Sequence, residues 1–275
     1  MAKEDVRKIV REGYGKIARE GSSCGCMPGC CGGSDMAGKL SKRIGYSDEE
    51  LSSVPEGANL GLGCGNPVAL ASLKEGETVL DLGAGAGFDA LLAAKRVGSS
   101  GKVIGVDMTP EMVYQARENA QKGDYKNVEF RLGEIENLPV ADSSIDVIIS
   151  NCVINLSPDK AKVFGEAFRV LKLGGRLMVS DIVLLKELPD AILNSVQAYL
   201  GCVAGAIKKD DYLKVIESAG FKSVRIIDET LFPVDLLTSD PTVRQVVKSL
   251  KIPSKMVKDI AASAMSIKVS GVKPA

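Results

Sequence analysis

The chain has 275 residues with 35 basic and 35 acidic side chains, so its formal net charge is zero. This balance gives no reason to expect a nucleic-acid partner, and no apolar run approaches the ~18 residues of a membrane span. Charged residues at positions 3–5 interrupt any secretory leader, so we expect a cytoplasmic protein whose seven cysteines stay reduced. The chain has no histidine, which excludes His-based zinc sites, Ser-His-Asp triads and imidazole bases.

Residues 1–75 are predicted to form an N-terminal region that caps the substrate. An amphipathic helix packed on the main domain is expected over residues 3–20. Residues 21–38 have no helical or strand period and predict a loop, which carries Cys24, Cys26, Cys30 and Cys31. A capping box at Ser47–Glu50 predicts a short helix that ends near Pro55. The glycine-rich segment that follows carries Cys64 and precedes a helical turn at Pro67.

Residues 76–184 show strands alternating with helices, which predicts a doubly wound, mostly parallel, Rossmann-like sheet. The expected strands are 78–82, 102–106, 128–132, 145–150 and 176–181. The expected helices are 88–97, 109–123 and a third capped by Ser157-Pro158 that ends at Gly174-Gly175. Ligands of such sheets bind at the carboxyl ends of the strands, near the switch point.

Residues 185–275 change this order and predict a substrate-binding or lid region with the last strands. The expected helices are 189–202, 210–219, 241–250 and 254–264. The expected strands are 222–228 and a final edge strand at 265–272. Helical insertions between late strands of such a sheet commonly cover a substrate.

A glycine-rich turn follows the first strand and carries Asp81, Gly83, Gly85 and Gly87. Glycine permits positive φ and lets a ligand approach the backbone, while the amides of the next helix face that ligand. A nicotinamide or flavin fingerprint fails because Phe88 occupies its last glycine position. The pattern resembles motif I of S-adenosylmethionine-dependent methyltransferases, with Asp81 placed to take the charged amine of the cofactor.

Further cofactor contacts are expected where the later strands end. Asp107 can accept the two ribose hydroxyls, and Met108 would lie against the adenine. Ile135 would sandwich the adenine, with either Glu134 or Glu136 bonding to it, a choice that the sequence leaves open. The predicted cofactor residues outside the glycine turn are Asp107, Met108, Gly133, Glu134, Ile135, Glu136 and Asn151.

Three cysteine-bearing segments closely resemble the arsenite methyltransferases. They are NLGLGCGNP (59–67), SNCVINLSPDK (150–160) and YLGCVAGA (199–206). The resemblance continues through YGKIA (14–18), IGYSDEEL, GVDMTPEM and LGEIENLP, and so covers nearly the whole chain. It implies S-adenosylmethionine-dependent methylation of trivalent arsenic, serving detoxification, with arsenic held by Cys64, Cys152 and Cys202.

The resemblance also implies a fourth cysteine and a reductant. The fourth cysteine, which can pair with Cys64, comes from the N-terminal cluster, where four candidates compete and we choose Cys31. A thiol of the glutathione or thioredoxin type is implied as co-substrate. The family often has an aromatic residue before the Cys64 motif, where this chain has Leu60 and Leu62. An aromatic contact to the methyl-bearing sulfur must therefore come from elsewhere or be absent.

The chemistry of the residues agrees with this interpretation. Trivalent arsenic is soft, and soft centres favour thiolate ligands. Three thiolates leave arsenic a lone pair for in-line attack on a sulfonium methyl group. That nucleophile carries no proton, which agrees with a chain lacking histidine.

Two other functions stay open. The first is methylation of a carbon or oxygen of a small metabolite, for which Tyr14 or Glu166 would be the base. The second is a non-catalytic thiol-based metalloid or zinc binder that uses the four cysteines between residues 24 and 31.

Overall fold

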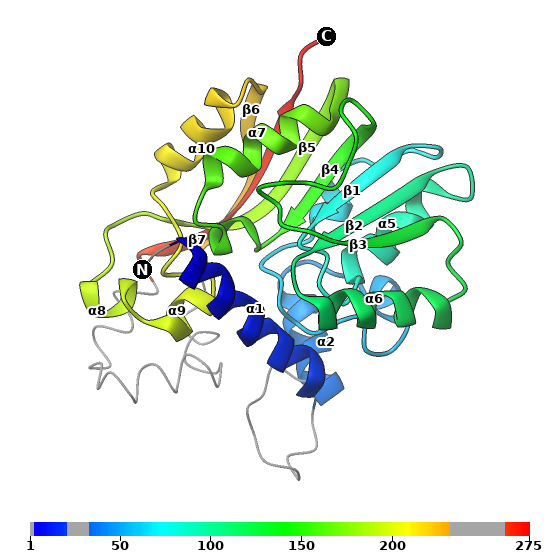
Figure 1. Ribbon diagram of the computed structural model, residues 1–275, viewed down its shortest axis with the longest axis horizontal. Coiled ribbons are helices and arrows are strands. Elements are labelled where there is room, and N and C mark those ends of the chain that lie inside the picture. Colours follow the sequence, from blue (N-terminus) through cyan, green and yellow to red (C-terminus); the bar gives the residue numbers. More distant parts are fainter. Residues whose placement is uncertain (1–2, 21–32, 232–261) are drawn as a thin grey trace.

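The computed structural model describes residues 3–20, 33–231 and 262–275 and organises them around one seven-stranded sheet. Its strand order is β3-β2-β1-β4-β5-β7-β6 (Figure 1). The strands are β1 Thr78–Leu82, β2 Lys102–Asp107, β3 Val128–Leu132, β4 Ile145–Asn151, β5 Leu171–Leu184, β6 Lys222–Leu231 and β7 Ala264–Val272. The five strands β1–β5 are parallel, which confirms the predicted doubly wound, mostly parallel sheet.

The last strand differs from its prediction. β7 is antiparallel to both β5 and β6 and lies between them, so β6 is the edge strand. The sequence reading of 265–272 as an edge was wrong. Ile267 and Val269 of β7 are fully buried, whereas β6 is mostly exposed and carries charges such as Asp228 and Glu229. Charged side chains on a sheet edge discourage pairing with other chains.

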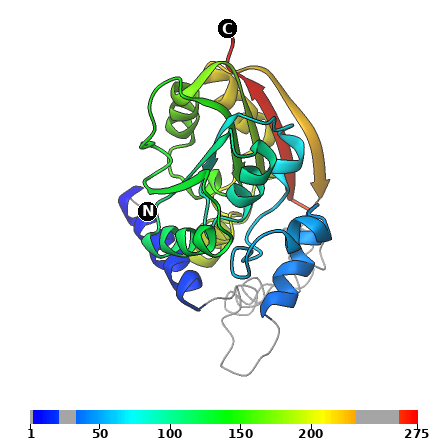
Figure 2. The same ribbon diagram turned by 90° about the vertical axis from the view of Figure 1, so that its right-hand side faces the viewer.

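Helices cover both faces of the sheet, and α1 and α2 lie below the carboxyl ends of the strands (Figures 1 and 2). Along β1, Val79 packs on one face against α5, while Leu80 and Leu82 pack on the other face in the core that α7 and α10 share. This is the two-residue period of a strand. The helices are α1 Lys3–Glu20, α2 Gly33–Arg43, α3 Asp48–Ser52, α4 Pro67–Leu70, α5 Phe88–Val97, α6 Pro110–Lys122, α7 Lys160–Val170, α8 Asp190–Leu193, α9 Val196–Leu200 and α10 Lys209–Ser218, with a 3₁₀ turn at Ile154–Leu156.

Several predicted boundaries are corrected. Residues 33–38, expected in a loop, begin α2, and the rest of that loop lies outside the described residues. The cap of α7 is Asp159, which accepts a bond from the amide of Lys162, whereas the Ser157 oxygen accepts from the amide of Asp159 ahead of the helix. That helix ends at Val170, before the predicted glycines, because β5 pairs with β4 from its first residue, Leu171.

The C-terminal helices are also only partly as predicted. The helix expected over 189–202 is broken into α8 and α9. The helices expected at 241–250 and 254–264 fall on residues that the structure describes only from 262 onward, where Ala264 begins β7. In the described ranges, no helix is both long and apolar enough to cross a bilayer.

Candidate functional site

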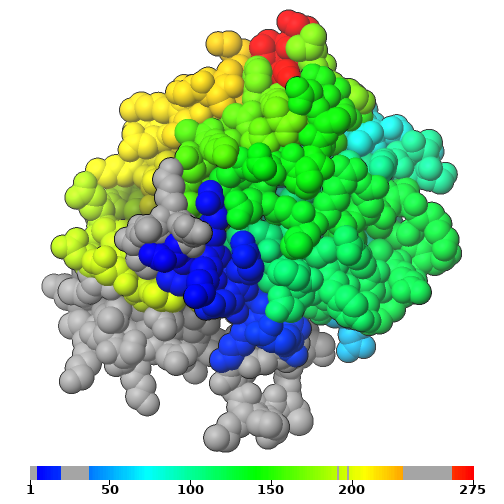
Figure 3. Space-filling model, in the orientation of Figure 1, coloured from blue at the N-terminus to red at the C-terminus, as the bar shows by residue number. Residues whose placement is uncertain are grey.

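A cleft opens where the carboxyl ends of β1, β2 and β4 meet the N-terminal helices. The helix α1 borders it with Arg7, Val10 and Tyr14, and in the space-filling view this helix lies across the molecule as a blue band (Figure 3). The sequence predicted a capping role for residues 1–75 and named Tyr14 as a candidate base, but it gave no sign that Arg7 and Val10 line the cleft. The rest of the lining comes from loop 58–63, the glycine turn after β1 and the ends of β2, β3 and β4.

The glycine turn has the backbone that the sequence predicted. Gly83, Gly85 and Gly87 all have positive φ, at 68°, 52° and 95°. A Cβ on Gly83 would lie 2.3 Å from a methyl group of Val153, so a side chain there would collide with the loop after β4. Gly85 has open space around its Cα and can admit a ligand close to the backbone.

Three carboxylates line the cleft without a matching positive charge. Burial raises the pKa of Asp81 well above its ordinary value, and Asp89 and Asp107 reinforce the shift. Within the described part of the chain, Oδ2 of Asp81 is buried and has no hydrogen-bond partner. Arg7 is the one basic side chain among the described lining residues, and it is already paired with Glu134 and Glu136. Such a cleft suits a cationic ligand, which would relieve the buried negative charge.

Asp89 and Tyr46 belong to this acidic group and were missed from the sequence. The Tyr46 hydroxyl donates to Oδ1 of Asp89 at 2.6 Å. Burial raises the pKa of Asp89 to about 6, although bonds from Tyr46 and Asn151 act against that shift. The available sign was a carboxylate two residues after Gly87, on a helix whose other buried residues are all apolar.

At the end of β2, Asp107 is held by backbone amides. Its Oδ1 accepts from the amide of Thr109 at 2.8 Å, and its Oδ2 accepts from the amide of Gly85 at 3.0 Å. A carboxylate oxygen has two lone-pair sites, so each oxygen can still accept from a ribose hydroxyl. Met108 follows in the lining of the cleft.

The structure distinguishes the two glutamates that the sequence could not. Glu136 is buried and lines the cleft together with Gly133 and Ile135. The Ser157 hydroxyl donates to its Oε1 at 2.8 Å. Glu134 is half-buried and pairs with Arg7 and Arg11. The geometry therefore favours Glu136 as the carboxylate that faces a ligand.

Three predicted cysteines from distant segments lie together beside the cleft. Cys64 precedes α4, Cys152 follows β4 and Cys202 follows α9, and all three are buried free thiols. The Cys202 thiol donates to the backbone carbonyl of Cys152 at 2.8 Å. Hydrogen bonding of the Cys152 thiol to the sulfur atoms of Cys202 and Cys64, together with burial, raises its pKa well above the ordinary value. Cys31 lies outside the described residues.

The glycines on both sides of Cys64 allow this close approach. A Cβ on Gly63 would lie 2.5 Å from Nδ2 of Asn151, and one on Gly65 would lie 2.0 Å from the hydroxyl of Ser180. Neither glycine can carry a side chain without moving the cysteine loop away from β4 and β5.

Cys152 and Cys202 both have left-handed backbone conformations, with φ of 58° and 61°. In a residue with a side chain such a conformation costs about 1–3 kcal/mol and tends to occur at functional sites. Here it lets the two segments that carry these cysteines turn sharply at the positions of the thiols.

Asn151 connects the cysteine loop to the acidic group. Its Oδ1 accepts from the amide of Cys64 at 2.9 Å. Its Nδ2 donates to the Gly65 carbonyl at 2.8 Å and lies 3.0 Å from both the Tyr46 hydroxyl and Oδ2 of Asp89. The sequence predicted Asn151 as a cofactor residue, and the structure places it between the two halves of the site.

Neither base candidate for carbon or oxygen methylation suits that role. Burial, reinforced by Cys202 and Cys152, raises the pKa of Tyr14 well above its ordinary value, and its hydroxyl donates to the Leu200 carbonyl. The pKa of Glu166 is lowered by its bond with Arg169, and this glutamate is not among the lining residues of the cleft. Tyr14 does bring an aromatic ring to the cleft.

Comparisons with known proteins agree with this arrangement. A family model described as a methyltransferase domain matches residues 73–220. The arsenite methyltransferase of Halobacterium salinarum is 51% identical over 232 residues, which cover 81% of this chain and 59% of that protein. The human arsenite methyltransferase is 32% identical, over 84% of this chain and 62% of that protein. This chain thus spans about three fifths of the length of these curated relatives.

Solved structures give the same result. The arsenic (III) S-adenosylmethionine methyltransferase of Chlamydomonas reinhardtii superposes with a TM-score of 0.61 at 33% identity, over 86% of this chain and 73% of that one. The YcgJ protein of Bacillus subtilis has the same TM-score at 24% identity and supports the fold alone.

Proposed function

Because this chain belongs to the family of S-adenosylmethionine-dependent arsenic methyltransferases, we propose that it methylates trivalent arsenic held by Cys64, Cys152 and Cys202. The observation that carries the proposal is the presence of three buried free thiols, from three separate segments, in one apolar cluster beside an acidic cleft. A single buried cysteine is ordinarily a small apolar residue. Three together, two of them in left-handed conformations, are better explained as ligands.

The cleft fits S-adenosylmethionine, which when bound supplies a methyl group on a positively charged sulfur. The unpartnered Oδ2 of Asp81 would accept from the ammonium group. Asp107 would accept the ribose hydroxyls, and Ile135 with Glu136 would hold the adenine. The glycine turn leaves room for the ligand against the backbone, because Gly85 has no neighbour within 4 Å of a Cβ position.

The cysteines would load arsenic by ligand exchange. Each thiol displaces a hydroxide or thiolate from trivalent arsenic, and its proton leaves with the displaced group as water or thiol. Exchange therefore needs no base, and none is required later because the arsenic lone pair attacks the methyl group without losing a proton. The protein's part is to hold arsenic in line with the methyl group, so proximity carries much of the rate.

The direct test is a turnover assay with arsenite, S-adenosylmethionine and an excess of thiol, with arsenic species separated and quantified. We expect methylated arsenic to form only when all three components are present. The proposal fails if the protein consumes no S-adenosylmethionine with arsenite but does methylate a carbon or oxygen acceptor in a separate reaction. It also fails if the purified protein binds arsenic stoichiometrically but never methylates it.

A prediction follows for Asp107. Replacing it by alanine should weaken S-adenosylmethionine binding by roughly ten- to hundredfold, since a charge-assisted hydrogen bond contributes ~1.5–3 kcal/mol. Arsenite affinity should change little, because the cysteines lie elsewhere. Calorimetry measures both affinities, and the exposed Asp142, which pairs with Arg169, provides the control D142A. Unchanged cofactor affinity in D107A would exclude Asp107 from the site.

Cofactor binding should also depend on pH through Asp89, whose pKa in the free protein is about 6. A cationic ligand favours the ionised carboxylate, so protonation of Asp89 should lower the affinity about tenfold between pH 7 and pH 5. The free fold responds in the opposite sense. Because its folded pKa is raised, Asp89 binds a proton more tightly in the folded chain and stabilises it as pH falls from 6 toward 4.

Calorimetric titrations of S-adenosylmethionine between pH 5 and pH 8 measure this dependence. The variant D89N should bind the cofactor more weakly at pH 7.5 and show a flatter profile. An equally steep profile in D89N would assign the pH dependence to another group.

We propose further that a thiol reductant of the glutathione or thioredoxin type serves as co-substrate and that the protein works in the cytoplasm. The N-terminal cysteines would deliver arsenic or form a disulfide with Cys64 that must be reduced in each cycle, with Cys31 our choice of partner. These four residues lie outside the described part of the chain.

Replacing all four N-terminal cysteines by serine should slow arsenic loading from glutathione complexes or stop the reaction after fewer methylations. The first methyl transfer at saturating arsenite should survive, because Cys64, Cys152 and Cys202 remain. Single-turnover methylation with a parallel melting curve measures both. If the first turnover is lost and melting is unchanged, one of the four is a direct arsenic ligand and the three-cysteine site is wrong.

A further inference from the structure

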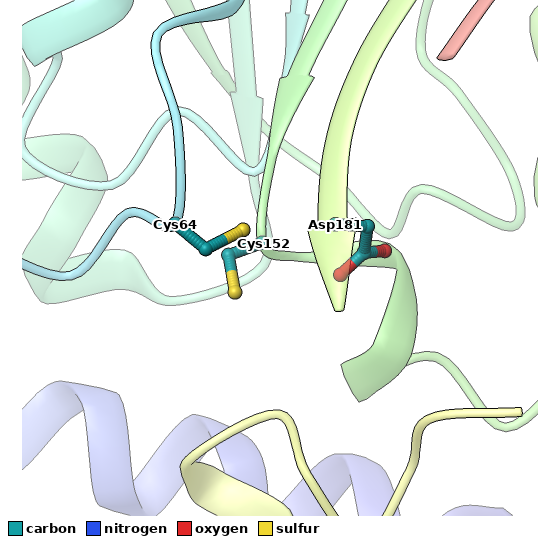
Figure 4. A group of neighbouring side chains, drawn as sticks. All are labelled: Cys64, Cys152 and Asp181. Atoms are coloured by element: carbon teal, nitrogen blue, oxygen red, sulfur yellow. The ribbon is translucent and has the colours of Figure 1, made fainter. Parts of the chain in front are cut away.

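Asp181 on β5 is a buried carboxylate beside the cysteines that arsenic methylation does not use. One of its oxygens and the sulfur atoms of Cys64 and Cys152 all lie within 4.8 Å of one another. Figure 4 shows the three side chains near the carboxyl ends of β4 and β5 and the loop that carries Cys64. All three are buried, so the group is shielded from bulk water.

Hydrogen bonds hold the carboxylate in one orientation. Its Oδ1 accepts from Nδ2 of Asn155 at 2.8 Å and from the amide of Ile182 at 2.9 Å. Its Oδ2 accepts from the hydroxyl of Tyr212, itself fully buried, at 3.0 Å. Metal-binding carboxylates are characteristically fixed by such outer hydrogen bonds.

The spacing suits a tetrahedral divalent cation. Zinc–sulfur bonds of ~2.3 Å and zinc–oxygen bonds of about 2.0–2.2 Å put neighbouring ligand atoms roughly 3.4–3.8 Å apart. Because the three ligand atoms lie within 4.8 Å of one another, they would need to close by roughly 1.0–1.4 Å at most. Two thiolates with one carboxylate are a donor set for a borderline-soft cation, whereas a carboxylate oxygen is a poor ligand for soft arsenic.

The local charge is also suitable. Two thiolates and one carboxylate with a divalent cation leave a net charge of −1. The ammonium group of Lys160, a half-buried residue, is attracted to Asp181 and Cys202. That cation offsets the remaining charge.

We propose that Cys64, Cys152 and Asp181 form a binding site for a divalent cation of the zinc and cadmium class. This cation competes with arsenic for the two shared thiols. Cation binding releases two thiol protons to solvent and leaves a fourth position for Cys202, whose thiol already contacts Cys152, or for water. The inference does not require arsenic to be the substrate. It predicts that zinc and cadmium inhibit the protein by occupying its thiols rather than its cofactor cleft.

The test uses the full chain with Cys24, Cys26, Cys30 and Cys31 replaced by serine, so that only three thiols remain. Cadmium chloride is titrated while the ultraviolet sulfur-to-cadmium charge-transfer band is recorded, and zinc chloride is then added as competitor. We expect one cadmium ion per chain, displaced by zinc and by excess arsenite. The ¹¹³Cd NMR shift should lie in the range of mixed sulfur and oxygen coordination.

In the same background, D181N should weaken cadmium binding at least tenfold and change arsenite affinity less than twofold. The control is D146N, because Asp146 is half-buried and pairs with Lys172 away from the thiols. Equal cadmium affinity in D181N, no cadmium binding, or an all-sulfur ¹¹³Cd shift would each overturn the inference. If D181N does not fold, the ¹¹³Cd shift of the protein that retains Asp181 decides the question. Cadmium binding without arsenite binding would overturn the proposed function and the competition with arsenic, and would leave only the cation site standing.

Discussion

Serine in place of Cys152 or of Cys202 is expected to reduce arsenic methylation by roughly a thousandfold or more, the scale seen when a group that contacts the reacting atoms is removed. Serine keeps the size of the side chain but presents a hard hydroxyl, which trivalent arsenic readily exchanges for thiol. With two protein thiols left, arsenic would be held less firmly, and its lone pair would point at the methyl group for a smaller fraction of the time. S-adenosylmethionine affinity should stay within about threefold, because the acidic group of the cleft is unchanged.

Single-turnover methylation, arsenite binding and cofactor calorimetry distinguish these effects. A useful control is A206S, which adds a hydroxyl to a buried residue of the same apolar cluster without removing a thiol. It should keep most of the activity. A serine variant at Cys152 or Cys202 with near-normal turnover would remove that cysteine from the arsenic site.

Replacing Asn151 by alanine is expected to damage arsenic binding and stability together. The change leaves the amide of Cys64 and the carbonyl of Gly65 without their side-chain partner. Each buried polar group left unpaired costs about 1–3 kcal/mol, so the free energy of unfolding should fall by roughly 2–6 kcal/mol. The cysteine loop would lose its link to β4, and arsenite affinity should fall at least tenfold even at temperatures where the variant is folded.

Asn127 provides a matched control for this variant. It is also half-buried and donates to two backbone carbonyls, those of Ala94 and Gly98, on the helix α5 side of the sheet. N127A should lose comparable stability but keep its arsenite affinity. If N151A and N127A bind arsenite equally well, Asn151 is only a structural residue.

The sequence alone was sufficient for much of the fold, because the signals involved are local. The apolar run at 78–82 and the glycines after it predicted β1 and its turn, and the structure has both, with positive φ at Gly83. The capping box at Ser47 and Glu50 likewise forms as predicted. Backbone preferences of glycine, caps and two-residue strand periods act within a few residues and can be recognised without knowing the fold.

Sheet order and element ends depended on contacts that no local pattern contains. β7 is an interior strand because it pairs with both β5 and β6. The position of residues 265–272 therefore depended on where β6 lies. The helix α7 ends early because Leu171 already pairs with Ile145 of β4. Pairing between distant strands overrides local helix preference.

For the site, the sequence and its family resemblance predicted Cys64, Cys152 and Cys202, but only tertiary structure decided what surrounds them. Asp181 belongs to β5 and Tyr14 to α1, which are distant in sequence from most of the thiols. Both lie beside the thiols because the sheet and the helix pack together there. Packing likewise distinguishes Glu136 from Glu134. Both residues follow β3, two positions apart, but the chain turns only Glu136 into the buried lining of the cleft. Residue type determines which chemistry is available, whereas burial and neighbours determine which of those residues can perform it.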